Sequence, residues 1–215
     1  MKRAGKKISA REQMLGRVRA ALGKRETPVA PPVYLNKTVK SDAGFVETFR
    51  QALTALGGSV VEVDTPEQAR AYLEPKLAGV RVAASDTALV RACGFAADFS
   101  RASCAAAEIG ITSADFALAD TGTLVFLSEP RLLSLLPPRH IAIIERAKII
   151  AGLDELFERV PQPAAVASSM VLVTGPSRTA DIEMRLVRGV HGPGEILVLI
   201  VGSGTRSTRD ASGGT

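Results

Sequence analysis

The chain has 215 residues, of which 46% are hydrophobic and 23% are charged, which fits one sizeable folded domain and predicts no second full domain. Its net charge of +5 is uneven, because residues 1–25 hold nine Lys and Arg against Glu12, leaving −3 for the remainder. Only 4% of residues are aromatic and Trp is absent, so we expect no nucleic-acid partner. We also expect no membrane span and a cytoplasmic location, because neither a long apolar run nor a signal-peptide pattern is present.

The first 41 residues are predicted to form a basic helix followed by a connector. Ser9 and Glu12 have the spacing of a capping box, and the helix is expected to end at Gly23. The apolar positions on one face of this helix are Met14, Leu15, Val18 and Leu22. This stripe needs a partner surface on the same chain or on a second subunit, so a homo-oligomer is possible. Residues 24–41 contain three prolines and are predicted to be extended.

Residues 42–202 alternate between strand and helix patterns, which predicts a single α/β domain. The predicted strands are 59–63, 80–84, 123–127, 140–144, 170–173 and 196–201. The predicted helices are 45–56, one starting at Thr65 and Pro66, 87–92, 111–119, 131–136 and 153–159. The pattern is weak over 95–110, where residues 105–109 could form a short strand or helix. Alternation of this kind favours a parallel sheet with helices on both faces, and the polar tail 203–215 is predicted to be disordered.

Two polar loops stand next to predicted strands. The sequence T-G-P-S-R-T-A-D-I-E at 174–183 follows one strand, and G-V-H-G-P-G-E at 189–195 leads into another. Loops at the carboxyl edge of an open α/β sheet commonly bind ligands, and we expect the first loop to lie there. Arg178 could bind a carboxylate or phosphate there through two parallel hydrogen bonds. Alternatively, the loop is a simple turn in which Arg178 pairs with Asp181 or Glu183.

A third polar segment, Asp120-Thr121-Gly122-Thr123, precedes a strand. It could hold a polar group of a substrate or supply an acid or base, but the same residue types also form ordinary turns. Of the two histidines, His140 begins an apolar strand and is expected to be structural. His191 stands among glycines, where substrate contact and a structural hydrogen bond are equally compatible with the sequence.

The sequence lacks the motifs of several kinds of metal, cofactor and nucleophile site. Cys93 and Cys104 are too few for a zinc or iron–sulfur site, and no local pairing supports a metal between His191 and Asp181 or Glu183. Neither a dinucleotide fingerprint nor a phosphate-binding P-loop is present, and Ser177 is not in a nucleophile elbow. We therefore expect neither a bound metal nor a cofactor.

Four segments in order resemble the lactate-utilisation protein C family, also called the LUD domain. They are I-T-S-A-D-F-A-L-A-D-T-G-T-L-V from residue 111, R-L-L-S-L-L-P-P-R-H-I-A from residue 131, G-P-S-R-T-A-D-I-E and G-V-H-G-P. The resemblance implies a three-layer α/β sandwich with a largely parallel sheet, similar to the sugar-phosphate isomerase and CoA-transferase superfamily. It also implies a role in oxidising L-lactate to pyruvate alongside iron–sulfur partner proteins. Family members commonly carry Glu before T-G-T, whereas this chain has the shorter Asp120.

Two functional hypotheses follow from these observations. The chain is either a component of a lactate-oxidation system that binds a small anionic metabolite or a partner, or an autonomous enzyme of CoA-transferase-like or isomerase-like type. The candidate acids, bases or nucleophiles are Asp120, Asp181 and Glu183. The candidate substrate-binding residues are Thr121, Gly122, Thr123, Gly175, Ser177, Arg178, His191 and Gly192.

Overall fold

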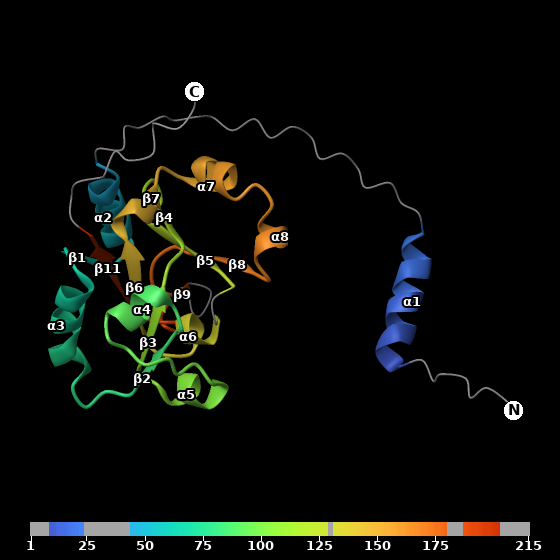
Figure 1. Cartoon of the computed structure of the whole chain (residues 1–215), viewed down its shortest axis with the longest axis horizontal. Helices are drawn as coiled ribbons and strands as arrows, with labels where there is room; N and C mark the ends of the chain where they lie inside the picture. Colours follow the sequence, from blue (N-terminus) through green and yellow to red (C-terminus); the bar gives the residue numbers. More distant parts are fainter. Residues whose placement is uncertain (1–8, 24–43, 129–130, 180–186, 203–215) are drawn as a thin grey trace, which may run out of the picture. The chain divides into compact units, whose positions relative to one another are not determined.

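The computed structural model describes residues 9–23, 44–128, 131–179 and 187–202, and the chain divides into units Met1–Leu35 and Asn36–Thr215 (Figure 1). In the first unit, α1 (Ala10–Leu22) has the predicted capping box: Glu12 N donates to Ser9 Oγ, and Ser9 N donates to Glu12 Oε2. The surface that covers its apolar stripe stays a prediction. The expected connector and the expected disordered tail lie outside the described residues.

Five parallel strands form the central sheet of the second unit, in the order β1-β11-β6-β3-β2. They are β1 (Ser59–Val63), β11 (Glu195–Val201), β6 (Arg139–Glu145), β3 (Ile109–Ser113) and β2 (Val82–Ala84). The three middle strands are nearly continuous apolar runs, as expected for parallel strands covered on both faces. The predicted α/β class with a largely parallel sheet is therefore confirmed.

Side chains of β6 alternate between two cores. Ala142 and Ile144 belong to a cluster with α2 (Phe45–Ala55), whereas Ile141 and Ile143 pack with helices on the opposite face. Those helices are α3 (Pro66–Leu77), which begins at the predicted Thr65 cap, and α4 (Ala88–Ala92), which is capped by Thr87. Helices thus cover both faces of the central sheet.

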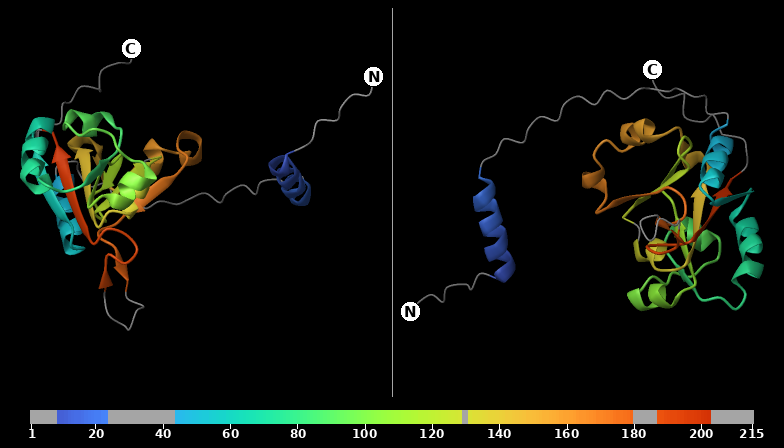
Figure 2. Two further views of the ribbon diagram at one scale, coloured as in Figure 1. Left: turned by 90° about the horizontal axis from the view of Figure 1, so that it is seen from below. Right: turned by 180° about the vertical axis from the view of Figure 1, so that it is seen from behind.

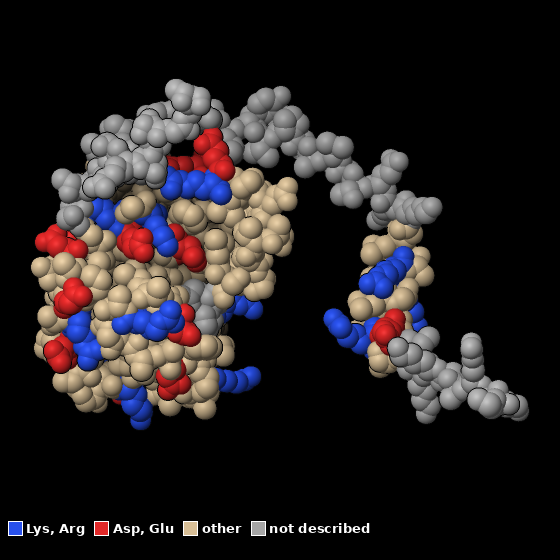
Figure 3. Space-filling view, in the orientation of Figure 1, with Lys and Arg blue, Asp and Glu red and all other residues tan. Residues whose placement is uncertain are grey.

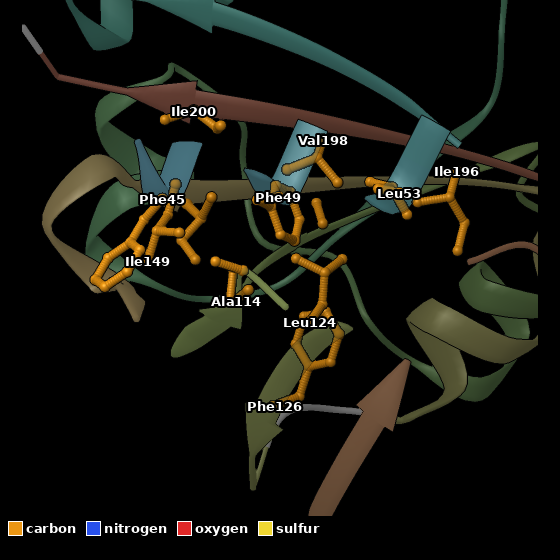
Figure 4. Close-up of a cluster of buried hydrophobic side chains, with 14 residues drawn as sticks. Phe45, Phe49, Leu53, Ala114, Leu124, Phe126, Ile149, Ile196, Val198 and Ile200 are labelled. Atoms are coloured by element: carbon orange, nitrogen blue, oxygen red, sulfur yellow. The ribbon is translucent and has the colours of Figure 1, made fainter. Parts of the chain in front are cut away.

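The α2 face is also covered by a second sheet of four strands, in the order β7-β4-β5-β8. They are β7 (Ile149–Ile150), β4 (Phe116–Leu118), β5 (Thr123–Leu127) and β8 (Met170–Val173). Phe49 and Leu53 of α2 are completely buried and lie between β11 and Leu124 of β5 (Figure 4). The outer face of this sheet packs on α7 (Leu153–Arg159) through Leu156.

Two predictions about these strands were wrong. Residues 111–119 form the end of β3 and all of β4 rather than a helix, because β4 pairs with β5 and Asp115 N donates to Val125 O. Tertiary pairing overrides the helical propensity of this Ala-containing segment. Strands β5 and β8 were expected in one sheet with the other strands, but they pair antiparallel with each other in the second sheet.

The shorter elements complete the unit. They are α5 (Arg101–Ala106), α6 (Arg131–Leu135), the 3-10 turn η1 (Arg146–Lys148), α8 (Pro163–Val166), β9 (Arg178–Thr179) and β10 (Val187–Arg188). Helix α6 lies so close to β3 that a Cβ on Gly110 would collide with the Leu133 carbonyl oxygen. The β9–β10 pair extends away from the two sheets (Figure 2). Among the described helices, none has the length and apolar character needed to cross a membrane.

Charges of both signs are interspersed on the visible face of the second unit (Figure 3). One group of charges links separate elements: the Glu62 carboxylate on β1 pairs with Arg50 of α2 and with Arg146 of η1. Arg146 Nε also donates to Gly202 O at 3.0 Å. This network, called here the Glu62 network, fastens η1 to the carboxyl ends of β1 and β11.

We expect Glu62→Gln to lower the free energy of unfolding by about 1 to 2 kcal/mol, because it weakens two partly buried ion pairs at once. Glu108→Gln is the matched control, since Glu108 makes one exposed contact of 4.0 Å with Arg81. Urea melts at low and high salt measure the difference. An equal effect from both substitutions would contradict the structural role of the Glu62 network.

Candidate functional site

A cavity of about 350 Å³ opens at the carboxyl ends of three adjacent parallel strands. Asp86 follows β2, Ser113 ends β3 and Glu145 ends β6, and all three line the cavity. This is the edge at which open α/β sheets bind ligands, and the volume is in the range of small-molecule sites. It is called here the strand-end cavity.

Asp115 is the half-buried carboxylate of the strand-end cavity. It lies between β3 and β4, and its Oδ2 accepts a hydrogen bond of 2.7 Å from Leu127 N at the end of β5. Burial raises the pKa of Asp115 above its ordinary value of 3.8, and the Leu127 N–H and the Lys148 ammonium oppose this shift. Groups with displaced pKa values cluster at functional sites and also occur in structural networks.

Lys148 supplies an ammonium group to the strand-end cavity from η1. Strands β4 and β7 run parallel with Ala117 opposite Ile149, so their register places Lys148 beside the start of β4. Asp86 has its own ion-pair partner, Arg91. Among the lining residues, Lys148 is the one that carries a positive charge for a ligand.

The remaining wall combines apolar and hydroxyl groups. Ser128 is the non-glycine residue with positive φ among those described, at 59°, and its Oγ accepts hydrogen bonds from Ser168 N and Oγ. Positive φ in a non-glycine residue is uncommon and recurs at functional sites. Ser85, next to Asp86, has a buried hydroxyl without a hydrogen-bond partner in the described part of the chain. The other lining residues are Thr87, Ala88, Leu89, Phe99 and Leu127.

Most of the site residues predicted from the sequence lie elsewhere, near the carboxyl end of α2. Thr121, Thr123 and Thr174 form a chain of hydroxyl contacts, each of 2.8 Å. Gly122 has φ +67°, and a Cβ there would collide with the backbone of α2 at Leu53. The structure thus brings the 120–123 turn next to Thr174, where the 174–178 loop begins.

Asp120 lies on the α7 side of this turn. Its Oδ1 accepts a 3.1 Å hydrogen bond from Thr121 Oγ1, and its backbone N donates to Ala151 O. A Cβ on Gly152 would be 2.5 Å from Asp120 Oδ2, so Gly152 gives this carboxylate its space. The geometry positions Asp120 firmly, and its role as an acid or base stays a prediction.

Arg178 donates to the Leu56 carbonyl oxygen at the end of α2. It stands opposite Arg188 across the β9–β10 pair, and a Cβ on Gly57 would be 3.2 to 3.3 Å from both guanidinium groups. Cations are favourable at the carboxyl end of a helix, where carbonyl groups lack partners. Arg178 therefore has a structural role, and ligand binding by Arg178 remains a prediction.

The first polar loop lies at a different sheet edge from the one expected, next to the second polar loop. Ser177 N donates to Pro193 O, and Gly194 N donates to Pro138 O, which places both loops at the amino ends of β6 and β11. Gly175 packs against Leu56, and Gly192 faces Ser177, while His191 is exposed. The candidates Asp181 and Glu183 lie outside the described residues.

The strand-end cavity was not predicted, although the sequence contains part of its signal. Asp86 comes two residues after one run that was correctly predicted as a strand, and Glu145 comes directly after another. Asp115 was hidden by the wrong helix prediction, because the end of β3 and the start of β4 were assigned to one element. The placement of Lys148 in the cavity depends on strand β7, which was not predicted from the sequence.

His140 is buried in the core, as expected for a structural histidine. Its Nε2 is 2.8 Å from Thr112 Oγ1, and its ring is tilted against Phe126. Burial lowers the pKa of His140 to about 4, so the ring is neutral at pH 7.

Cys93 and Cys104 are buried free thiols, and burial raises the pKa of Cys93 to about 11. Within the described residues, no group of three or more His, Cys, Asp or Glu could hold a metal ion.

Together, these features define an α/β protein with a cavity at the carboxyl edge of its parallel sheet. The family model described as the LUD domain matches residues 46–201, and the chain belongs to this family.

Curated relatives carry the name lactate utilization protein C. The protein of Halalkalibacterium halodurans is 41% identical over 102 residues, covering 44% of each chain. That of Bacillus subtilis is 39% identical over 102 residues, covering 44% of this chain and 42% of the relative. These two matches each span less than half of the relative. The lactate utilization protein C of an Exiguobacterium species is 29% identical, and its match covers 90% of this chain and 96% of the relative.

Among solved structures, the fold is similar to a crystal structure of a duf162 family protein from Deinococcus radiodurans. The TM-score is 0.58 at 21% sequence identity, covering 76% of this chain and 100% of the other. At this identity, the likeness concerns the fold alone.

We expect Arg178→Ala to lower the free energy of unfolding by about 0.5 to 1 kcal/mol, because the last turn of α2 loses a charged donor. Arg178→Lys should recover part of the loss, since an ammonium group keeps the charge but not the planar geometry. Thermal melts of both variants measure the effect. An unchanged melting temperature in the alanine variant would show that the Leu56 contact contributes nothing.

We expect the stability of Asp115→Asn, relative to the natural chain, to increase as pH rises from about 3.8 and then to level off. The raised pKa means that the folded natural chain binds this proton more tightly than the unfolded chain, so deprotonation costs it stability. Urea melts between pH 3.5 and 8 measure this trend. Asp64→Asn, at an exposed position outside the strand-end cavity, is the control; equal trends for both variants would argue against it.

Proposed function

We propose that the chain takes part in lactate utilisation, and that it binds a small hydroxy- or oxo-carboxylate in the strand-end cavity. The shared family and the names of the relatives support the first part of the proposal. The juxtaposition of Lys148 and half-buried Asp115 in one cavity carries the second part.

The two side chains complement the two ends of such a ligand. The Lys148 ammonium can hold the carboxylate, and Asp115 can accept a hydrogen bond from a hydroxyl or, when protonated, donate one to an oxo group. The other two carboxylates that line the cavity, Asp86 and Glu145, repel a bound anion only weakly. Asp86 is paired with Arg91, and Glu145 is exposed, so water screens its charge.

The electrons removed when lactate becomes pyruvate need an acceptor, and we propose that iron–sulfur partner proteins provide it. The support for this step is the family resemblance of the sequence. The expected homo-oligomer and the expected cytoplasmic location stay predictions. The alternative of an autonomous CoA-transferase-like or isomerase-like enzyme is favoured by one observation, the half-buried Asp115 carboxylate in the lining of the strand-end cavity.

We expect Lys148→Ala to weaken binding of lactate or pyruvate by roughly tenfold to a hundredfold, because a charged hydrogen bond contributes about 1.5 to 3 kcal/mol. Isothermal titration calorimetry measures the affinity. Lys76→Ala is the matched control, because Lys76 lies over Tyr72 on α3, away from the cavity lining. Equal affinity in all three proteins, or no binding to the natural chain, would rule out this ligand site.

A further inference from the structure

We propose that the strand-end cavity catalyses proton exchange at the carbon next to the carbonyl of a small 2-oxo acid, with Asp115 as the base. The inference rests on the proposed function, because it places the ligand in the same cavity and on the same Lys148. It adds an activity that the chain performs without an electron acceptor or a partner protein.

Asp115 is held in a fixed position by β5. Its backbone N donates to Val125 O at 2.9 Å, and its Oδ2 accepts from Leu127 N at 2.7 Å. These two bonds immobilise one edge of the residue. Its Oδ1 makes no hydrogen bond to another described residue, and the residue lines the cavity. One carboxylate oxygen is therefore anchored while the other can receive a proton.

Lys148 is positioned independently of the ligand. It belongs to η1, whose first residue, Arg146, is fastened by the Glu62 network to Glu62 and to Gly202 O. After Lys148, the chain enters β7, which pairs with β4 immediately beyond Asp115. The ammonium group and the carboxylate are thus delivered to one cavity by neighbouring strands of one sheet.

This pair can carry out enolisation. Asp115 takes a proton from C3 of the 2-oxo acid as the C3–H bond breaks, and that electron pair forms the C2–C3 double bond. The π pair of the carbonyl moves onto its oxygen, where the Lys148 ammonium stabilises the negative charge. Because a 2-oxo acid places a carboxylate oxygen beside the C2 oxygen, one ammonium can contact both. The protonated Asp115 carboxyl exchanges its proton with water and then returns a solvent proton to C3. This regenerates the ligand, so no oxidant or reductant is consumed.

Burial supports the choice of base. A carboxyl group whose pKa is raised by desolvation, as that of Asp115 is, is a stronger base when ionised than an exposed one. The exchange rate should therefore increase with pH through the pKa of Asp115 and then level off. An exposed carboxylate in free solution would not give this combination of position and basicity.

The test uses the full chain with pyruvate in deuterium oxide. Proton NMR follows loss of the pyruvate methyl signal, and we expect exchange well above that in buffer alone. Asp115→Asn should slow it by about a hundredfold or more while calorimetry shows that pyruvate still binds. Asp64→Asn should leave the rate unchanged, and thermal melts confirm that each variant is folded.

The outcomes separate the two proposals. Pyruvate binding without exchange in the natural chain overturns the catalytic inference and leaves the proposed binding function intact. Exchange that persists in folded Asp115→Asn overturns the assignment of the base. Absence of pyruvate binding to the natural chain overturns both proposals.

Discussion

The second unit depends on the burial of α2 between two sheets. Phe49 and Leu53 are fully buried against β11 on one side and β5 on the other (Figure 4). Full burial of such a side chain contributes about 1.5 to 3 kcal/mol, so this layer is a main source of stability. It also sets the spacing between the parallel sheet and the second sheet, and hence where the loops of the two sheets meet.

The two ends of this arrangement have different polar surroundings. At one end, the 120–123 turn and the 174–178 loop close around the carboxyl end of α2, where Arg178 and the Thr123–Thr174 contact join them. At the other end, β4 and β7 start beside the carboxyl ends of the parallel strands and bring Asp115 and Lys148 to the strand-end cavity. The second sheet therefore completes the wall of a cavity that the parallel sheet leaves open.

The position of Asp115 shows why the site could not be derived from sequence spacing. Its partners, Leu127 N and Lys148, are separated from it by turns and by strands whose pairing is nonlocal. The segment around it has good helical propensity in isolation, and strand pairing with β5 outweighs that propensity. The loops at 174–178 and 189–194 were correctly expected to be neighbours of strands, but the edge of the sheet at which they lie depends on sheet membership.

The sequence by itself determined the α/β class, the capped helices that follow Ser9 and Thr65, and most strands of the parallel sheet. These features follow from local patterns, because caps, periodicity and apolar runs involve residues a few positions apart. Only the tertiary structure decided that β8 joins a separate sheet, that Arg178 contacts α2, and that Asp115 shares a cavity with Lys148. Those outcomes depend on which distant strands pair and on which surfaces are buried together, and a linear pattern does not contain that information.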